Sequence, residues 1–527
     1  MRVSPSAATV GRSRRCAPAR PRCRPEKEPL ASREHRIKGG EIQTRMFHFK
    51  KVRTRLVLLA RSLIFPAASE RRGRMTKSES MTNDETRSIA LYHSGSGIFS
   101  SFVIRVSSFL VISLSIVLPA SQAADNLGIL GAHPKWAVLE NYQETITHDE
   151  FARLIQGVYC THGFAPDLIE ISEKTARILT NREAQKFFTL RFAKDDASRE
   201  PIPRLWRAAE SLPPAKQEKP LSSLRIALDP GHLGGKWAKM EERWFQVGAT
   251  PPVEEGDLTL RVARLLAPRL RKLGAKVFFV RNSDEPITPK RPDDFKELAR
   301  RILIKNGVPQ PRVDVLDASD PEKEQTIRWQ SEILFYRYSE IRRRAALVDF
   351  KLHPDLVLCL HFNAEGWGDP NAPTLIDTNH LHLLVNGSYL KDELEFDDER
   401  FEMIRRLLSR AYDEELPLAD TIAGAMARET KLPPYEYPTT KSTTKVGTSG
   451  YVYARNLLAT RLYRCPVVYC EPYVMNSNDV FARIQAGDYE GTRNANGVER
   501  KSIFREYADS VVDGLVEYYR NARGRGD

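Results

Sequence analysis

Residues 224–232 read Leu-Arg-Ile-Ala-Leu-Asp-Pro-Gly-His. The apolar run Leu224–Asp229 predicts a buried strand, which the Pro-Gly dipeptide ends abruptly. Strand ends in α/β folds collect catalytic groups, because the rigid sheet fixes them while the adjoining turn exposes them. His232 is therefore a candidate metal ligand, and its partners have to come from the rest of the chain.

Outward from this stretch, predicted strands alternate with predicted helices. Further strands are expected at 275–280, 355–361, 380–385 and 466–471, and helices at 256–273, 397–412, 416–430 and 502–519. Residues 285–352 are mostly helical, polar and charged by pattern. Alternating strands and helices predict an α/β fold with a mostly parallel central sheet and helices on both faces.

Composition divides the chain into five segments. They are a basic low-complexity extension (1–80), a secretion-signal region (81–123), a small α+β N-terminal module (124–211), a linker (212–221) and the main α/β domain (222–522). The module contains a helix start, since Thr147 is followed three residues later by Glu150. The linker is Pro-rich.

The net charge of +13 is unevenly spread along the chain. Residues 1–123 hold 23 Lys and Arg against 8 Asp and Glu, whereas residues 124–527 hold 58 against 60. The part that can fold is close to neutral, so its composition argues against nucleic-acid binding. Residues 1–80 are either a disordered basic arm or an extension that is not translated, with the true start at Met75 or Met81. We favour the second interpretation.

Residues 102–123 have the layout of a secretory signal. Arg105 precedes a short apolar core, and Ser121 and Ala123 stand at the −3 and −1 positions of a cleavage site. A membrane anchor is the alternative, but the run is short for a span of about 20 residues. We therefore expect an exported protein, periplasmic or extracellular, with no stable membrane span after cleavage.

Four cysteines follow this signal, and export would permit disulfides. Cys359 and Cys470 lie inside apolar strand-like runs, where buried free thiols are the commoner outcome. We predict no disulfide framework.

Metal-binding or acidic side chains follow three of the predicted strands. His232 follows the first, His361 ends the strand at 355–361, and Glu471 ends the strand at 466–471. Glu255 stands where the first long helix begins. The carboxyl ends of parallel strands share one edge of a sheet, so these residues can converge there.

Two His and one carboxylate are a ligand set typical of catalytic zinc, which keeps a fourth position open. Such zinc lowers the pKa of its water towards about 7 and polarises a carbonyl oxygen. A second carboxylate is then needed to pass a proton to the leaving nitrogen. Glu471 fits that need.

Four motifs in this order resemble the zinc-dependent N-acetylmuramoyl-L-alanine amidases of the cell-wall hydrolase type. They are Asp-Pro-Gly-His at 229–232, Glu-Gly-Asp-Leu-Thr-Leu at 255–260, Leu-His-Phe-Asn-Ala at 360–364 and Glu-Pro-Tyr-Val-Met-Asn-Ser-Asn-Asp at 471–479. The resemblance spans residues 222–522, and any one motif alone would be weak. It implies that residues 222–522 are a catalytic zinc amidase domain acting on peptidoglycan.

The resemblance also implies roles for single residues. His232, Glu255 and His361 would bind Zn²⁺, and Glu471 would be the catalytic acid/base. The reaction would cleave the amide between N-acetylmuramic acid and L-alanine. Two alternatives remain: another secreted zinc peptidase or deacylase on the same fold, and a non-catalytic peptidoglycan-binding protein.

This sequence departs from the family's pattern in two places. The loop 236–253 is longer than usual and carries Glu241 and Glu242; together with Glu254 they compete with Glu255 for the role of carboxylate ligand. Residues 285–340 are longer than the connection that the family usually has at this point. This insertion is a candidate for covering the substrate groove or for regulating activity, and a regulatory partner is one possible means. The loop 386–396 and the segment 435–453 are candidates for substrate contacts or a lid.

Four further residues are interpreted as supporting the site rather than reacting in it. Asp229 is expected to orient the turn at His232 or its imidazole. Arg344, on a charged helix, is expected to be solvated or ion-paired. His380 and His382 alternate along a predicted strand, and we interpret them as structural or substrate-lining.

Overall fold

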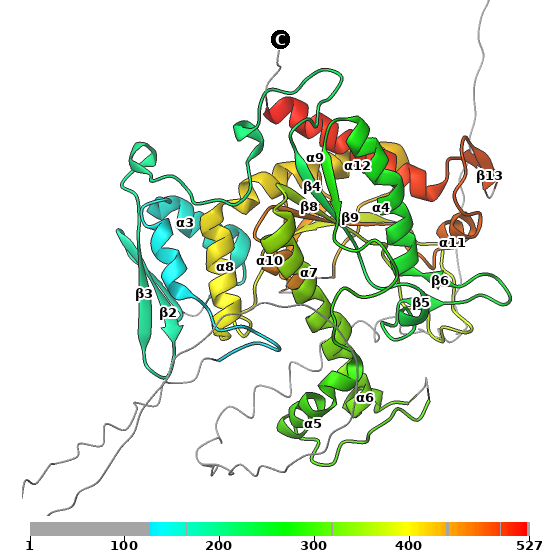
Figure 1. The fold of residues 1–527 in the computed structure, drawn as a ribbon, viewed down its shortest axis with the longest axis horizontal. Helices are drawn as coiled ribbons and strands as arrows, with labels where there is room; N and C mark the ends of the chain where they lie inside the picture. Colours follow the sequence, from blue (N-terminus) through cyan, green and yellow to red (C-terminus); the bar gives the residue numbers. More distant parts are fainter. Residues whose placement is uncertain (1–125, 165, 318–319, 439–441, 496, 524–527) are drawn as a thin grey trace, which may run out of the picture. The chain divides into compact units, whose positions relative to one another are not determined.

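The computed structural model describes residues 126–523 apart from 165, 318–319, 439–441 and 496, and contains a seven-stranded central sheet (Figure 1). The expectations for residues 1–123 lie outside the described residues. The strands of the sheet are β4 (Arg225–Pro230), β7 (Lys276–Phe279), β8 (Leu356–Leu360), β9 (Leu381–Val385), β10 (Thr443–Val446), β11 (Val452–Arg455) and β12 (Val467–Pro472).

Their order across the sheet is β10-β11-β9-β12-β8-β4-β7. Strands β7, β4, β8 and β12 are parallel to their neighbours among these four. Strand β9 runs antiparallel to β12, and β11 follows β9 in direction. The predicted α/β fold with a mostly parallel sheet is confirmed.

Successive residues of each central strand enter two different apolar cores. Leu228 and Leu358 pack on one face, with the helices α4 (Glu255–Lys272), α9 (Ala411–Thr430) and α12 (Ile503–Ala522). Ala227 and Val357 pack on the other face, with α7 (Ile341–Leu347) and α10 (Leu458–Leu462). In Figure 1, α9 and α12 run side by side. Burial on both faces explains why these strands are apolar throughout.

Helix α4 begins one residue before the predicted start. Glu255 and Asp257 lie in its first turn, where the helix dipole favours negative charge, and three basic residues lie in its last turn. The helix ends at Lys272, and Gly274 follows with a φ of +99° that favours glycine. The start of α4 therefore presents Glu255 at the edge where β4 ends.

The predicted helical segment before β8 builds a small core of its own. Helix α6 (Ile327–Ile333) packs against α5 (Lys296–Lys305) and continues through a π-helical stretch, Leu334–Glu340, into α7. Leu233, directly after His232, is buried in this core. The segment thus packs against the loop that follows β4.

Residues 136–211 contain the antiparallel strands β1 (Ile169–Ile171), β2 (Thr175–Asn181) and β3 (Lys186–Arg191), together with helix α3 (His148–Leu154). This part contacts helix α8 (Asp397–Ser409): Arg400 Nε donates a hydrogen bond to the Leu179 carbonyl at 2.8 Å. The loop 386–396 also lies here, since Ser388 N donates to the Val158 carbonyl at 2.7 Å. That loop therefore packs against the N-terminal part of the described chain.

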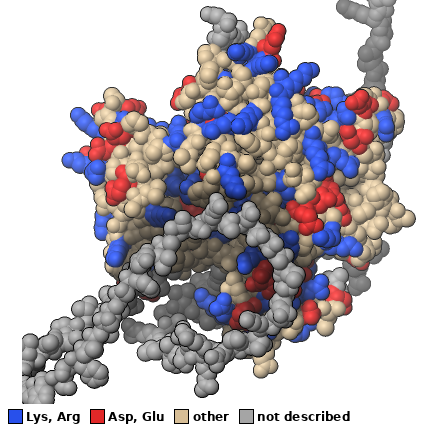
Figure 2. All heavy atoms as spheres, in the orientation of Figure 1, with Lys and Arg blue, Asp and Glu red and all other residues tan. Residues whose placement is uncertain are grey.

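Basic and acidic side chains are intermingled over the face drawn in Figure 2. This agrees with the near balance of charge in residues 124–527. Among the described residues, no helix combines the length and apolarity that crossing a bilayer requires.

Asp355 ties the start of β8 to β4 and to Arg207, which precedes the linker. Its buried carboxylate accepts hydrogen bonds from Arg225 N at 2.9 Å, Arg225 Nη2 at 3.0 Å and Arg207 Nη2 at 2.6 Å. Burial alone would raise the pKa of Asp355, yet the hydrogen bonds from both arginines hold it below its usual range.

We predict that Asp355→Ala lowers the free energy of unfolding by about 3 kcal/mol, because two guanidinium groups lose a buried partner. Urea denaturation at neutral pH measures this. The stabilisation by a carboxylate of lowered pKa is present above its unfolded-state pKa and is lost as pH falls through the folded-state value. The difference in the free energy of unfolding between the wild type and Asp355→Ala should therefore become smaller in acid.

The matched control is Glu517→Ala, which removes an exposed ion pair with Arg428. This change should lower the free energy of unfolding by less than about 1 kcal/mol. Equal losses in the two variants would contradict the role given to Asp355.

Candidate active site

His232 stands directly beyond β4 in a tight turn. Its φ is +56°, in the left-handed region that non-glycine residues seldom adopt. A Cβ added at Gly231 would lie only 2.1–2.4 Å from ring atoms of His361. Glycine at 231 is thus required for the two imidazoles to approach, and their ring centroids are 5.0 Å apart.

Arg344 of α7 holds this turn in place. Its Nη1 donates to Asp229 Oδ1 at 3.0 Å and to the Pro230 carbonyl at 2.8 Å, and its Nη2 donates to the His232 carbonyl at 3.1 Å. Glu340 and the Tyr463 hydroxyl complete the buried network. Arg344 is therefore ion-paired rather than solvated, and Asp229 orients the turn through it.

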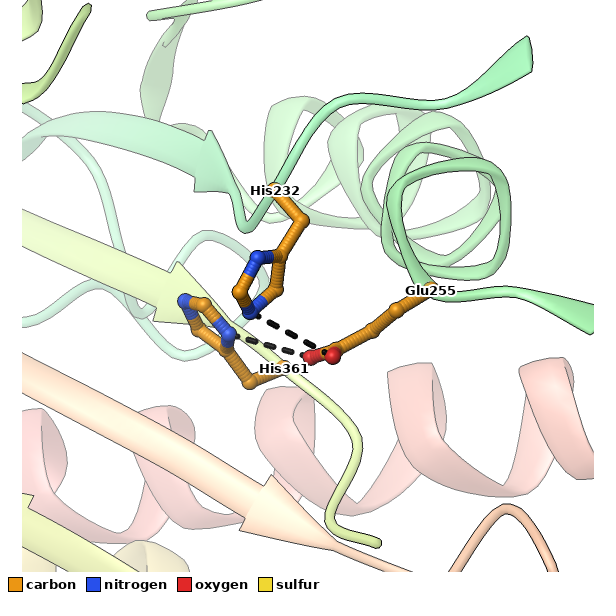
Figure 3. A group of neighbouring side chains, drawn as sticks. All are labelled: His232, Glu255 and His361. Carbon is orange, nitrogen blue, oxygen red and sulfur yellow. Dashed lines mark hydrogen bonds and ion pairs between the residues drawn. The ribbon is translucent and has the colours of Figure 1, made fainter. Parts of the chain in front are cut away.

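The carboxylate of Glu255 faces both imidazoles from one side and contacts one nitrogen of each (Figure 3). Its Oε2 is 3.3 Å from His232 Nε2, and its Oε1 is 3.1 Å from His361 Nδ1. Phe362 N also donates to Oε1 at 3.1 Å. Burial alone would raise the pKa of Glu255, but His232 and His361 lower it to about 2. The group is an anion that faces one ring nitrogen of each histidine.

The other carboxylates near this site have different partners. Glu241 Oε2 is 2.7 Å from the outer nitrogen of His232, Nδ1. Glu254 accepts from Gly235 N at 3.2 Å, and Glu242 pairs with Lys323. Of the four carboxylates that compete by sequence, Glu255 is the one that contacts both imidazoles.

The residues present fit a zinc ion. One ligand atom from each of His232, Glu255 and His361 can be chosen so that all lie within 4.8 Å of one another. Ligands at 2.0–2.2 Å in a tetrahedron are roughly 3.3–3.6 Å apart, close to the contacts found here. A carboxylate on the second nitrogen, as Glu241 provides, fixes a histidine ligand's tautomer. Burial lowers the pKa of His232 despite both nearby carboxylates, which favours the neutral ring that metals bind.

Glu471 lies beside this cluster, at the end of β12. Strands β12 and β8 pair in parallel with Cys470 opposite Leu360, so Glu471 and His361 are the next residues along neighbouring strands. The His361 ring stacks on Tyr469 at 4.1 Å between centroids. Burial raises the pKa of Glu471, against the effect of His361. The structure thus brings all four predicted site residues to one edge of the sheet.

The sequence named His382 and the segment 435–453 as candidates for lining the substrate site, but it did not place them beside Glu471. Strand β9 pairs antiparallel with β12, so its first residues lie at the same edge, and His382 Nε2 is 3.4 Å from Glu471 Oε2. Tyr437 Oη is 2.9 Å from the same nitrogen. The alternation of His380 and His382 was the available signal, but strand direction was needed to use it.

Two arginines also face this region. Arg243 Nε is 3.5 Å from Glu255 Oε2, and Arg455 Nη1 donates to Tyr437 Oη at 3.5 Å. The charges of both arginines lower the pKa of Glu471, an effect smaller than that of burial. The segment 435–453 thus contributes to the site, whereas the loop 386–396 lies against the N-terminal part. The described cysteines (Cys160, Cys359, Cys465 and Cys470) are buried and free.

The chain is similar to several solved structures. They include the N-acetylmuramyl-L-alanine amidase Ami1 from Mycobacterium smegmatis (15% identity over 57% of this chain and 99% of that chain, TM-score 0.31). Another is the N-acetylmuramoyl-L-alanine amidase from Clostridium difficile 630 (15% identity over 56% of this chain and 97% of that chain, TM-score 0.29). A third is the catalytic domain of CwlV, an N-acetylmuramoyl-L-alanine amidase from Bacillus (Paenibacillus) polymyxa var. colistinus (13% identity over 56% of this chain and 97% of that chain, TM-score 0.28). Neither a family model nor a curated protein matches the sequence.

We predict that Gly231→Ala lowers the free energy of unfolding by about 1–3 kcal/mol, because the new methyl group forces the His361 ring out of place. Chemical denaturation of the purified protein measures the loss. Gly157→Ala is the control, since a Cβ there would meet nothing within 4 Å. A Gly231→Ala protein as stable as the control would show that the turn does not need glycine.

Proposed function

We propose that this chain is a zinc-dependent N-acetylmuramoyl-L-alanine amidase that acts on peptidoglycan. The observation that carries the proposal is the convergence of His232, His361 and the Glu255 carboxylate, with Glu471 beside them at the same sheet edge. A buried anion held against two imidazoles is expensive unless a cation or a proton compensates it. A structural role alone would not require all four groups together.

His232, Glu255 and His361 would hold the zinc ion. Zinc held there supplies Lewis-acid chemistry, polarising a carbonyl oxygen and lowering the pKa of water. Glu241 orients His232 through its outer nitrogen, and Arg344 fixes the backbone of the same residue. These contacts preset the ligand geometry before any metal arrives.

Glu471 acts as the general acid/base. It accepts the proton of the attacking water as the new C–O bond forms, and it delivers that proton to the amide nitrogen as the C–N bond breaks. The products are a free lactyl carboxylate and a free amino group on L-alanine. A carboxylate whose pKa is raised by burial is suited to hold the proton between the two steps.

The proposed substrate rests on the resemblance of the four motifs beginning at Asp229, Glu255, Leu360 and Glu471 to those of N-acetylmuramoyl-L-alanine amidases. Export is supported by the signal pattern at 102–123, which lies outside the described residues. We infer a periplasmic or extracellular, cell-wall-associated enzyme whose partner is peptidoglycan. A secreted zinc peptidase or deacylase would use the same four residues and would differ in the fragments it releases.

Glu471→Gln should keep bound zinc and lose turnover by about 10²- to 10⁴-fold, because the amide cannot carry the proton. The assay incubates purified protein with peptidoglycan and identifies the new amino termini by mass spectrometry. The control is Glu517→Gln, which makes the same chemical change at an exposed carboxylate paired with Arg428. Undiminished release of L-alanine termini by Glu471→Gln would refute the acid/base assignment, and cleavage at another bond would favour the peptidase or deacylase alternative.

His361→Ala should abolish stoichiometric zinc binding, since one of three protein ligands is lost. Metal analysis after dialysis, with the wild type expected to retain about one zinc per chain, measures this. His148→Ala, on α3 in the N-terminal part, should bind as the wild type does. Full retention of zinc by His361→Ala would exclude it as a ligand.

A further inference from the structure

The pairing of β9 with β12 places His382 directly opposite Glu471. The two residues are Cα partners in an antiparallel ladder, so their side chains stand on the same face of the sheet. His382 is 1% exposed, and its Nε2 lies 3.4 Å from Glu471 Oε2. The contact is set by strand register, which makes it a fixed feature of the sheet.

A second group of contacts holds the His382 ring in place. Tyr437 Oη lies 2.9 Å from Nε2, and the Tyr435 ring lies 5.0 Å from the imidazole between centroids. Backbone hydrogen bonds tie this segment to the start of β9: Tyr435 N donates to the Leu381 carbonyl at 3.0 Å. The Tyr453 hydroxyl donates to the Tyr435 carbonyl at 2.8 Å.

The environment favours one protonation state of His382. Burial lowers its pKa to about 3, with smaller effects from His380 and Arg455, so the ring is neutral and carries a single N–H. Its Nδ1 is buried and has no hydrogen-bond partner among the described residues. A proton on Nδ1 would leave a buried donor unpaired, and Nε2 would then accept from the Tyr437 hydroxyl at 2.9 Å. A proton on Nε2 leaves no donor unpaired, because that N–H faces both Tyr437 Oη at 2.9 Å and Glu471 Oε2 at 3.4 Å.

We propose that His382 is a positioning residue for Glu471: its Nε2–H donates to Oε2 of Glu471 and leaves Oε1 to exchange the proton. This inference rests on the proposed function, because it assigns a role within that reaction. The 3.4 Å separation is long for a hydrogen bond, as such contacts often are before substrate binds. Tyr437 and Arg455 form the next layer, through the Arg455 Nη1 to Tyr437 Oη contact.

The test compares His382→Met with His382→Gln in the full, zinc-loaded chain acting on peptidoglycan. Methionine removes the donor, whereas the glutamine amide can place an N–H near the position of Nε2. We expect His382→Met to lower kcat by about 10- to 100-fold with KM little changed, and zinc content to stay at the wild-type level. His382→Gln should recover most of kcat.

His148→Gln is the control, because His148 lies on α3 in the N-terminal part and its ring nitrogen Nδ1 pairs with the neighbouring Asp149. It should keep kcat close to wild type. Wild-type kcat in His382→Met, or equal losses in the methionine and glutamine variants, would overturn the positioning role while leaving the amidase proposal intact.

A measurement that does not depend on activity is ¹⁵N NMR of histidine-labelled, metal-free protein, with His382 assigned by its loss in His382→Gln. We expect the Nε2–H tautomer at neutral pH, and an Nδ1–H tautomer would overturn the positioning role. If the wild type does not hydrolyse peptidoglycan, the proposed function fails, and the tautomer still tests whether Nε2 carries the proton that Glu471 would accept.

Discussion

The contact of the Glu255 carboxylate with both His232 and His361 is the interaction around which the whole site is built. Each partner comes from a different element: a turn after β4, the first turn of α4 and the end of β8. The parallel pairing of β4 with β8 brings the two histidines to one edge. Glycine at 231 lets their rings approach, and Arg344 keeps the strained turn in place. Loss of any of these contacts would free one of the three side chains from its place in the cluster.

Much of this arrangement could be predicted from the sequence. The strands around Leu228, Leu358 and Val468 are apolar on both faces, and that pattern by itself indicates a buried parallel sheet. Helix α4 has acidic residues at its start and glycine after its end, so its predicted limits were nearly correct. Three of the four site residues, His232, His361 and Glu471, follow from strand ends in a parallel sheet, and Glu255 follows from the start of the first long helix.

Other features could not be predicted, for physical reasons. The direction of β9 is not encoded in five residues that are all buried, and without it His382 could not be placed beside Glu471. Arg344 lies in a run of arginines that is typical of a solvated helix face, and only tertiary packing shows that it is buried against Asp229. Glu241 could not be separated from Glu242, because loop geometry decides which of them reaches His232.

Residues 124–527 are close to neutral overall, but charged groups gather at the site, where three carboxylates, two imidazoles and Arg243 lie close together. Anomalous diffraction from zinc-soaked crystals is the sharpest test of this site. We predict one strong zinc peak within about 2.0–2.2 Å of His232 Nε2, His361 Nδ1 and a Glu255 oxygen, with Glu471 outside bonding distance. Zinc bound elsewhere, or ligated by Glu471 in place of Glu255, would contradict the proposed ligand set.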